Sequence, residues 1–190
     1  MSSLRQINRV KHGFDRTLLI VMNTLVFSKV FYCSNMSASC SKLNIDKLQL
    51  VQKFACRIVR GIRKYDHVTP KLKCLSWLPV SSQLYYRNAL LALKCMNGRA
   101  PEYLSTFFTK RCDVNRYTTR NSQLLSVHVP LLKTASGQRT FYYWTVSIWN
   151  SLESILKLSS NESIFKKCLK SKLLRDFLGC SWYNKWSVVM

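Results

Sequence analysis

Acidic side chains are scarce in this sequence, which contains 8 Asp and Glu against 30 Lys and Arg among its 190 residues. Two-metal polymerase and nuclease sites need several carboxylates that converge on the cations, and the sequence contains no Asp-Asp pair. We therefore expect no complete active site of this kind, and no enzyme activity from this chain on its own. The formal net charge of +22 favours an anionic partner, either nucleic acid or a membrane surface.

Glycine and closely spaced metal ligands are also scarce. The 5 glycines are isolated, so no glycine-rich loop is present to hold a phosphate. The 8 cysteines form no C-x-x-C pair and the 3 histidines are scattered, so we expect no cofactor and no metal. Reduced thiols are favoured over disulfides or a metal site, with Cys56, Cys95 and Cys168 as small buried hydrophobes in apolar-periodic runs. Reduced thiols indicate the nucleus or the cytoplasm.

Long hydrophobic runs are absent as well. The only candidate targeting segment is Leu18–Phe27, which Asn23 and Thr24 interrupt, whereas a membrane-spanning helix needs about 20 apolar residues. A signal peptide is disfavoured, because the region before the run is long and contains Asp15. We expect a buried helix here and no transmembrane span.

The sequence does contain helical periodicity, and 47% of its residues are apolar. We predict a mostly α fold: a helical bundle at 1–104, a polar connecting region at 105–140, a looser, partly irregular C-terminal part at 141–178 that ends in a basic helix, and a poorly ordered tail at 179–190. The expected helices are Ile7–Tyr32, Ile45–Ile62, Val80–Met96 and Glu162–Leu178, with shorter pieces near Glu102–Phe107 and Phe141–Ser151.

Residues typical of helix ends and extended segments refine these bounds. Asn44 and Asn161 are predicted helix N-caps. Thr69-Pro70 predicts a short helical turn, and Asn97-Gly98 predicts a helix end. Leu124–Pro130 is expected to be a short extended segment.

The predicted helix Ile45–Ile62 has an apolar face and, opposite to it, a basic face. At about 100° per residue, its apolar residues share an arc of about 100°; they are Leu48, Val51, Ala55, Ile58, Val59 and Ile62. The basic residues on the opposite side fall within about 60° and are extended by Arg63; they are Lys53, Arg57, Arg60 and Lys64. A merely solvated face normally has interspersed acidic residues, and none lies between Lys47 and Lys64. We predict that Lys53, Arg57, Arg60, Arg63 and Lys64 bind nucleic-acid phosphates, with plain solvation as the alternative.

The last predicted helix carries a second basic cluster beside its apolar residues. Its members are Lys166, Lys167, Lys170, Lys172 and Arg175. Lysine is a less specific phosphate ligand than arginine, so we interpret this cluster as the solvated face of an amphipathic helix.

A series of short sequence blocks resembles one known family. The blocks, in order, are Leu25–Ser34, Lys47–Val59, Tyr65–Pro70, Leu75–Val80, Asn97–Leu104, Thr118–Arg120, Gly137–Phe141, Trp149–Leu152 and Phe165–Lys166. Their order and spacing resemble the segment after the catalytic palm in reverse transcriptases of non-LTR (LINE-type, jockey-like) retrotransposons. The resemblance runs from about Arg5 to Leu174. Each block alone is weak, and the ordered series is specific.

The resemblance implies the thumb and the region after it of an RNA-directed DNA polymerase, which is similar to a helical clamp on a template–primer duplex. The helical region 1–104 is then thumb-like, and its partners are RNA or DNA together with the fingers and palm, expected upstream of Met1. The sequence departs from the family pattern at Ser37, where Trp is usual, and at Cys40 and Cys56, where Thr and Ala are commoner. These departures are typical of a drifting fragment.

Two other functions remain open. A helical protein-interaction or structural remnant needs no nucleic-acid contact. A membrane-surface protein would use the Leu18–Phe27 run and its basic flanks. Non-specific, electrostatic binding of RNA or DNA is the leading hypothesis.

Overall fold

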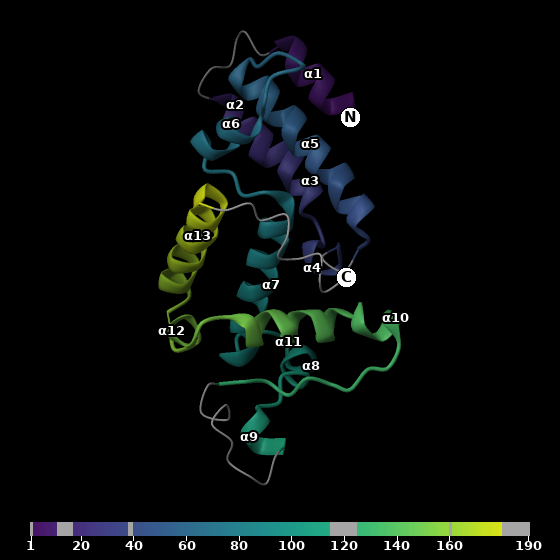
Figure 1. Cartoon of the computed structure of the whole chain (residues 1–190), viewed down its shortest axis with the longest axis vertical. Helices are drawn as coiled ribbons and strands as arrows, with labels where there is room; N and C mark the ends of the chain where they lie inside the picture. The colour runs from purple at the N-terminus through teal and green to yellow at the C-terminus, as the bar shows by residue number, and fades with distance from the viewer. Residues whose placement is uncertain (1, 11–16, 38–39, 115–124, 160, 180–190) are drawn as a thin grey trace. The chain divides into compact units, whose positions relative to one another are not determined.

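The computed structural model describes residues 2–10, 17–37, 40–114, 125–159 and 161–179 (Figure 1). The predicted mostly α fold is confirmed, and these residues contain no strand beyond one isolated bridge between Lys110 and Val127. The helices are α1 (Ser2–Val10), α2 (Thr17–Val21), the π-helix η2 (Met22–Phe27), α3 (Ser28–Val30), α4 (Ser34–Ser37), α5 (Lys42–Arg60), α6 (Thr69–Cys74), α7 (Val80–Met96), α8 (Glu102–Ser105), α9 (Arg111–Val114), α10 (Ala135–Gln138), α11 (Phe141–Ser151), α12 (Ser154–Lys157) and α13 (Glu162–Gly179).

The chain divides into two compact units, each built from separate stretches of sequence. Unit 1 comprises residues 1–34, 41–83 and 173–190, and unit 2 comprises residues 35–40 and 84–172. Divisions fall inside α4, α7 and α13, so these helices contribute residues to both units. They do not coincide with the predicted boundary at residue 104.

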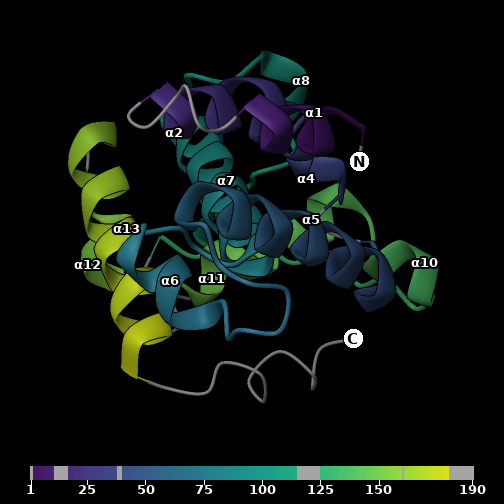
Figure 2. The same cartoon turned by 90° about the horizontal axis from the view of Figure 1, so that it is seen from above.

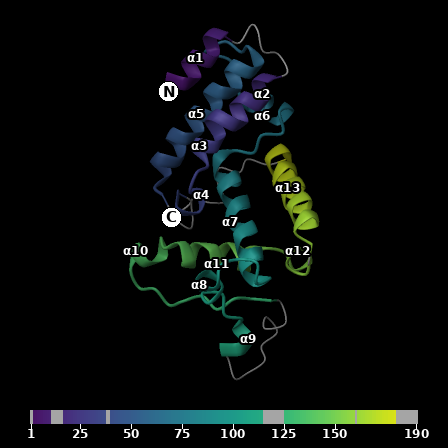
Figure 3. The ribbon, with the colours of Figure 1, turned by 180° about the vertical axis from the view of Figure 1, so that it is seen from behind.

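Helix α5 lies between α1 and α6 in unit 1, as the three ribbon views show (Figures 1, 2 and 3). Its buried side chains include Ala55, Cys56 and Ile58. Cys56 packs with Val68 and Leu72 in a buried cluster, against which partly buried apolar side chains lie; they are Ile62, Leu75, Trp77 and Phe177. This packing attaches the segment after α5 to the unit core.

Two glutamines of α5 fix the segment that leads into α7. Gln49 Oε1 accepts a hydrogen bond from the Val80 amide at 2.8 Å, and Gln52 Nε2 donates to the Leu78 carbonyl at 2.8 Å. The two side chains also bond to each other at 2.8 Å. Gln52 is therefore buried with its polar atoms satisfied, which the apolar pattern did not predict.

In unit 2, side chains of α11 hold an extended segment that runs alongside the helix (Figures 1 and 3). The Arg111 amide donates to the Ser126 carbonyl and the His128 amide to the Thr109 carbonyl, so the amide and carbonyl of Val127 face away from residues 109–111. Asn150 satisfies both: its Oδ1 accepts from the Val127 amide at 3.0 Å and its Nδ2 donates to the Val127 carbonyl at 2.9 Å.

Trp149 adds a further contact to the same segment. Its Nε1 donates to the Leu125 carbonyl at 2.8 Å, and its side chain is 1% exposed. The pair Trp149-Asn150 thus provides packing and backbone hydrogen bonds together, which gives this block a structural role.

Several helix bounds agree with the sequence prediction. Helices α7 and α11 match the predicted ranges at both ends, and Gly98 has the left-handed φ of 64° expected where α7 ends. The predicted cap at Asn161 is confirmed, because its Oδ1 accepts from the Ser163 amide at 2.9 Å. The bridge at Val127 lies within the predicted extended segment.

Other predicted features are wrong. Asn44 is not an N-cap, because α5 begins at Lys42 after Ser41. Cys168 is exposed on α13 rather than buried, whereas Cys56 and Cys95 are buried. The helix predicted at Ile7–Tyr32 comprises α1 and a later run from Thr17 to Val30 that includes η2.

Some predictions fall on residues outside the described part. These are residues 11–16 of the predicted first helix, Thr118–Arg120, Leu124 and the tail beyond Gly179. All seven cysteines in the described part are free thiols.

We predict that Asn150→Ala lowers the free energy of unfolding by about 2–4 kcal/mol, because it leaves two backbone groups of buried Val127 without partners. Denaturant unfolding measures the loss. Asn97→Ala is the matched control, since Asn97 is exposed at the end of α7. An Asn150→Ala loss no larger than that of Asn97→Ala would contradict the role assigned to the Asn150 amide.

Candidate nucleic-acid interface

Three of the predicted phosphate ligands share one face of α5. Lys53, Arg57 and Arg60 follow one another at spacings of four and three residues, which places them on one side of a helix. Arg60 is exposed, and Lys53 and Arg57 are half-buried. We call these three residues the basic ridge.

Arg63 and Lys64 do not continue this ridge, contrary to the predicted arc. Helix α5 ends at Arg60, and Gly61 takes a left-handed conformation with φ 62°. The Gly61 amide and the Ile62 amide both donate to the Arg57 carbonyl, which closes the helix and turns the chain away. The predicted helix extension to Ile62 overlooked this glycine, whose lack of a Cβ makes the turn favourable.

Residues 61–67 form a loop, here called the basic loop, whose ends are attached to the core. Ile62 is half-buried against the Cys56 cluster, and Val68 is 5% exposed within it. Between them every side chain from Arg63 to His67 is exposed. The Arg63 amide donates to Asp66 Oδ2 at 3.3 Å, and the Asp66 amide donates to the Arg63 carbonyl at 3.3 Å. These bonds give the loop a defined turn.

The five predicted ligands have no carboxylate partner in the described part of the chain: none of them forms an ion pair within 4.0 Å. The Nε atom of Arg57 is buried without a hydrogen-bond partner there. Burial raises the pKa of the neighbouring Cys56 thiol, and the charges of Arg60 and Arg57 oppose that rise.

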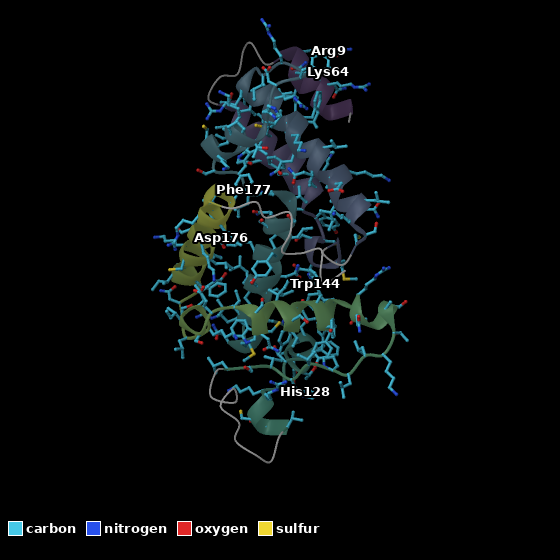
Figure 4. The ribbon with its side chains drawn as sticks, viewed as in Figure 1. Arg9, Lys64, His128, Trp144, Asp176 and Phe177 are labelled. Carbon is cyan, nitrogen blue, oxygen red and sulfur yellow. The ribbon has the colours of Figure 1, made fainter. Side chains whose placement is uncertain are left out.

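Helix α1 adds further positive charge to unit 1. Arg5 and Arg9 are exposed four residues apart, so they share a face of α1. Figure 4 shows Arg9 and Lys64 at the same end of the unit. Neither arginine was among the predicted phosphate ligands, although their spacing is visible in the sequence.

The cations of unit 2 are arranged differently, because several of them pair with acids. Glu162, at the start of α13, forms ion pairs with Lys166 at 2.7 Å, with Lys94 at 3.7 Å and with Arg99 at 3.9 Å. The hydrogen bond from Lys166 lowers the pKa of Glu162 and raises that of Lys166.

Lys172, a member of the second basic cluster on α13, pairs with Glu153. The remaining members of the second basic cluster, Lys167, Lys170 and Arg175, are exposed on α13. The cluster is thus partly paired and partly solvated, which fits the interpretation of an amphipathic helix better than a dedicated phosphate site.

Tyr65 lies next to Lys64 in the basic loop and was not among the predicted binding residues. Lys64 Nζ lies 5.4 Å from the centre of the Tyr65 ring, and Tyr65 is 88% exposed. The available signal was an aromatic residue directly after Arg63 and Lys64, between a helix-ending glycine and the Thr69-Pro70 turn.

No three His, Cys, Asp or Glu residues of the described part are arranged to hold a metal ion. Nor is any helix in the described ranges long and apolar enough to cross a membrane. The chain matches no protein-family model, no curated protein and no solved structure.

We predict different effects on thermal stability for two charge-removing substitutions. Glu162→Gln should lower Tm, because it leaves Lys94, Arg99 and Lys166 without their shared carboxylate. Arg60→Gln should leave Tm unchanged or raise it slightly, because Arg60 has no acidic partner among the described residues and the protein is highly positive. Thermal unfolding in low salt measures both, and the Glu162 effect should shrink in high salt. If Arg60→Gln lowered Tm more than Glu162→Gln does, the description of the ridge as a surface without acidic partners among the described residues would be refuted.

The lowered pKa of Glu162 sets the sign of a pH dependence. A carboxyl whose pKa is lower in the folded state stabilises the fold above its unfolded value, and that stabilisation is lost as pH falls through the folded value. The Tm difference between the parent and Glu162→Gln should therefore shrink as the pH is lowered below 4.5. A difference that stays constant over this range would contradict the ion-pair contribution.

Proposed function

We propose that this chain binds RNA or DNA through the phosphate backbone, without sequence preference, using the basic ridge and the basic loop. One observation supports this most directly: no carboxylate of the described residues pairs with the five predicted ligands on α5 and the loop after it, which are Lys53, Arg57, Arg60, Arg63 and Lys64. Positive side chains that have no internal partner are available to replace the counterions of a phosphate backbone.

We further propose that the chain is the thumb and post-palm segment of a non-LTR retrotransposon reverse transcriptase. The ordered sequence blocks support this origin, and the helical character of unit 1 is compatible with a clamp on a template–primer duplex. The chain would then contribute binding rather than catalysis, with the palm and fingers of the parent polymerase as protein partners. The free thiols fit a place in the nucleus or cytoplasm.

A second candidate, a helical protein-interaction module, is favoured by exposed apolar residues on α5. Leu43 is 74% exposed and Leu50 is 58% exposed, and their spacing of seven residues puts them on one side of the helix. This stripe offers a contact for another protein, and it neither requires nor excludes nucleic acid binding at the ridge.

The proposed function predicts a steep dependence of affinity on salt. Four phosphate contacts would weaken the binding of an RNA–DNA duplex roughly 100-fold between 50 and 200 mM salt, because each contact releases a counterion. Fluorescence anisotropy with a labelled duplex measures this dependence. An affinity that barely changes over this range would refute backbone binding.

A triple variant tests which cations are responsible. Arg57→Gln, Arg60→Gln and Lys64→Gln together should reduce the slope of log affinity against log salt by about 3 and weaken all sequences alike. The control replaces Lys167, Lys170 and Arg175 with Gln, which removes the same net charge from exposed positions on α13. Equal effects of the two triple variants would show that net charge alone, rather than the ridge and loop, drives binding.

A further inference from the structure

The basic loop exposes an aromatic side chain to solvent, and both ends of the loop pack against the core of unit 1. Ile62 and Val68 hold the two ends in the Cys56 cluster, and Gly61 closes the helix before it. Tyr65 lies between them with 88% of its side chain exposed. Because both ends are anchored and Asp66 bonds back to the Arg63 amide, this exposure comes from a loop with a defined turn.

Two cations precede Tyr65 in the basic loop, and one acid follows it. Lys64 Nζ lies 5.4 Å from the ring centre, and exposed Arg63 precedes it. The nearest acid in sequence, Asp66, already accepts the Arg63 amide at 3.3 Å. An exposed ring beside backbone-binding cations is the arrangement by which proteins hold single strands, since every base has a face that can stack.

We propose that Tyr65 stacks on an unpaired base while the cations of the basic ridge and basic loop hold the adjoining phosphates. The preferred ligand is therefore a single strand, or a strand end, rather than the interior of a closed duplex, whose base faces are covered by their neighbours. This inference rests on the proposed function, and it adds a second kind of contact to the electrostatic one.

The experiment compares two probes on the full chain by fluorescence anisotropy at one salt concentration. One probe is an oligo-dT of roughly 12 nucleotides, and the other is a longer blunt RNA–DNA duplex with few exposed base faces. Tyr65→Ala should weaken oligo-dT binding about tenfold and change duplex binding less than about twofold. Tyr65→Phe should keep the parent affinity for both probes, because the ring remains.

Tyr32→Ala is the matched control, since Tyr32 is another tyrosine of unit 1 and is 77% exposed. Both tyrosines are surface residues, and thermal unfolding verifies that each variant folds like the parent. The Tyr32 variant should bind oligo-dT as the parent does. The salt slope of Tyr65→Ala should also equal that of the parent, because no phosphate contact is removed.

The possible failures are distinguishable. If the parent binds both probes with a steep salt dependence and Tyr65→Ala changes neither affinity, the stacking role is wrong and the proposed function stands. If Tyr65→Ala weakens both probes equally, the ring acts on the loop or on Lys64 rather than on a base, and the stacking role is again wrong. If the parent binds neither probe, the proposed function fails and the inference fails with it.

Discussion

The packing of the segment after α5 into the Cys56 cluster is the interaction on which the candidate interface depends. Ile62 and Val68 enter this cluster from the two ends of the basic loop, while Ala55 and Ile58 bury the opposite side of α5 from the ridge. Burying these apolar side chains stabilises the unit, and it also fixes which side of the helix faces solvent. The cations of α5 are presented outward because the other side of the helix is committed to the core.

The few acids of the chain influence the two units unequally. Glu162 and Glu153 pair with lysines and an arginine in unit 2, where such pairs join α13 to other elements. The ridge and loop of unit 1 receive no such partner within the described residues. A protein with 8 acids and 30 basic residues cannot neutralise its surface internally, so the placement of those acids decides where positive charge remains available. Among the described residues it remains at the basic ridge and the basic loop, and also at Lys167, Lys170 and Arg175 of α13.

The sequence predicted the helices with strong periodicity better than the details that orient the site. Helices α7 and α11 matched their predicted ranges because apolar spacing and flanking residues agreed there. The ridge at Lys53, Arg57 and Arg60 followed from helical spacing alone. Lys64 was misplaced because a helical projection assumes that the helix continues, whereas Gly61 ends it. The buried Gln52 and the paired state of Lys166 depend on residues far away in sequence, which no local pattern contains.

The bond between Asn150 and Val127 has a consequence for solubility. An extended segment with an unpaired amide and carbonyl along one side is a template for pairing with the same segment of another molecule. Residues 109–111 cover one side of the segment at Val127, and the Asn150 amide covers the other. The side chain of Asn150 therefore makes the two backbone hydrogen bonds that a third strand would otherwise make at Val127. It closes the backbone edge at Val127, and so keeps that position from recruiting a second chain.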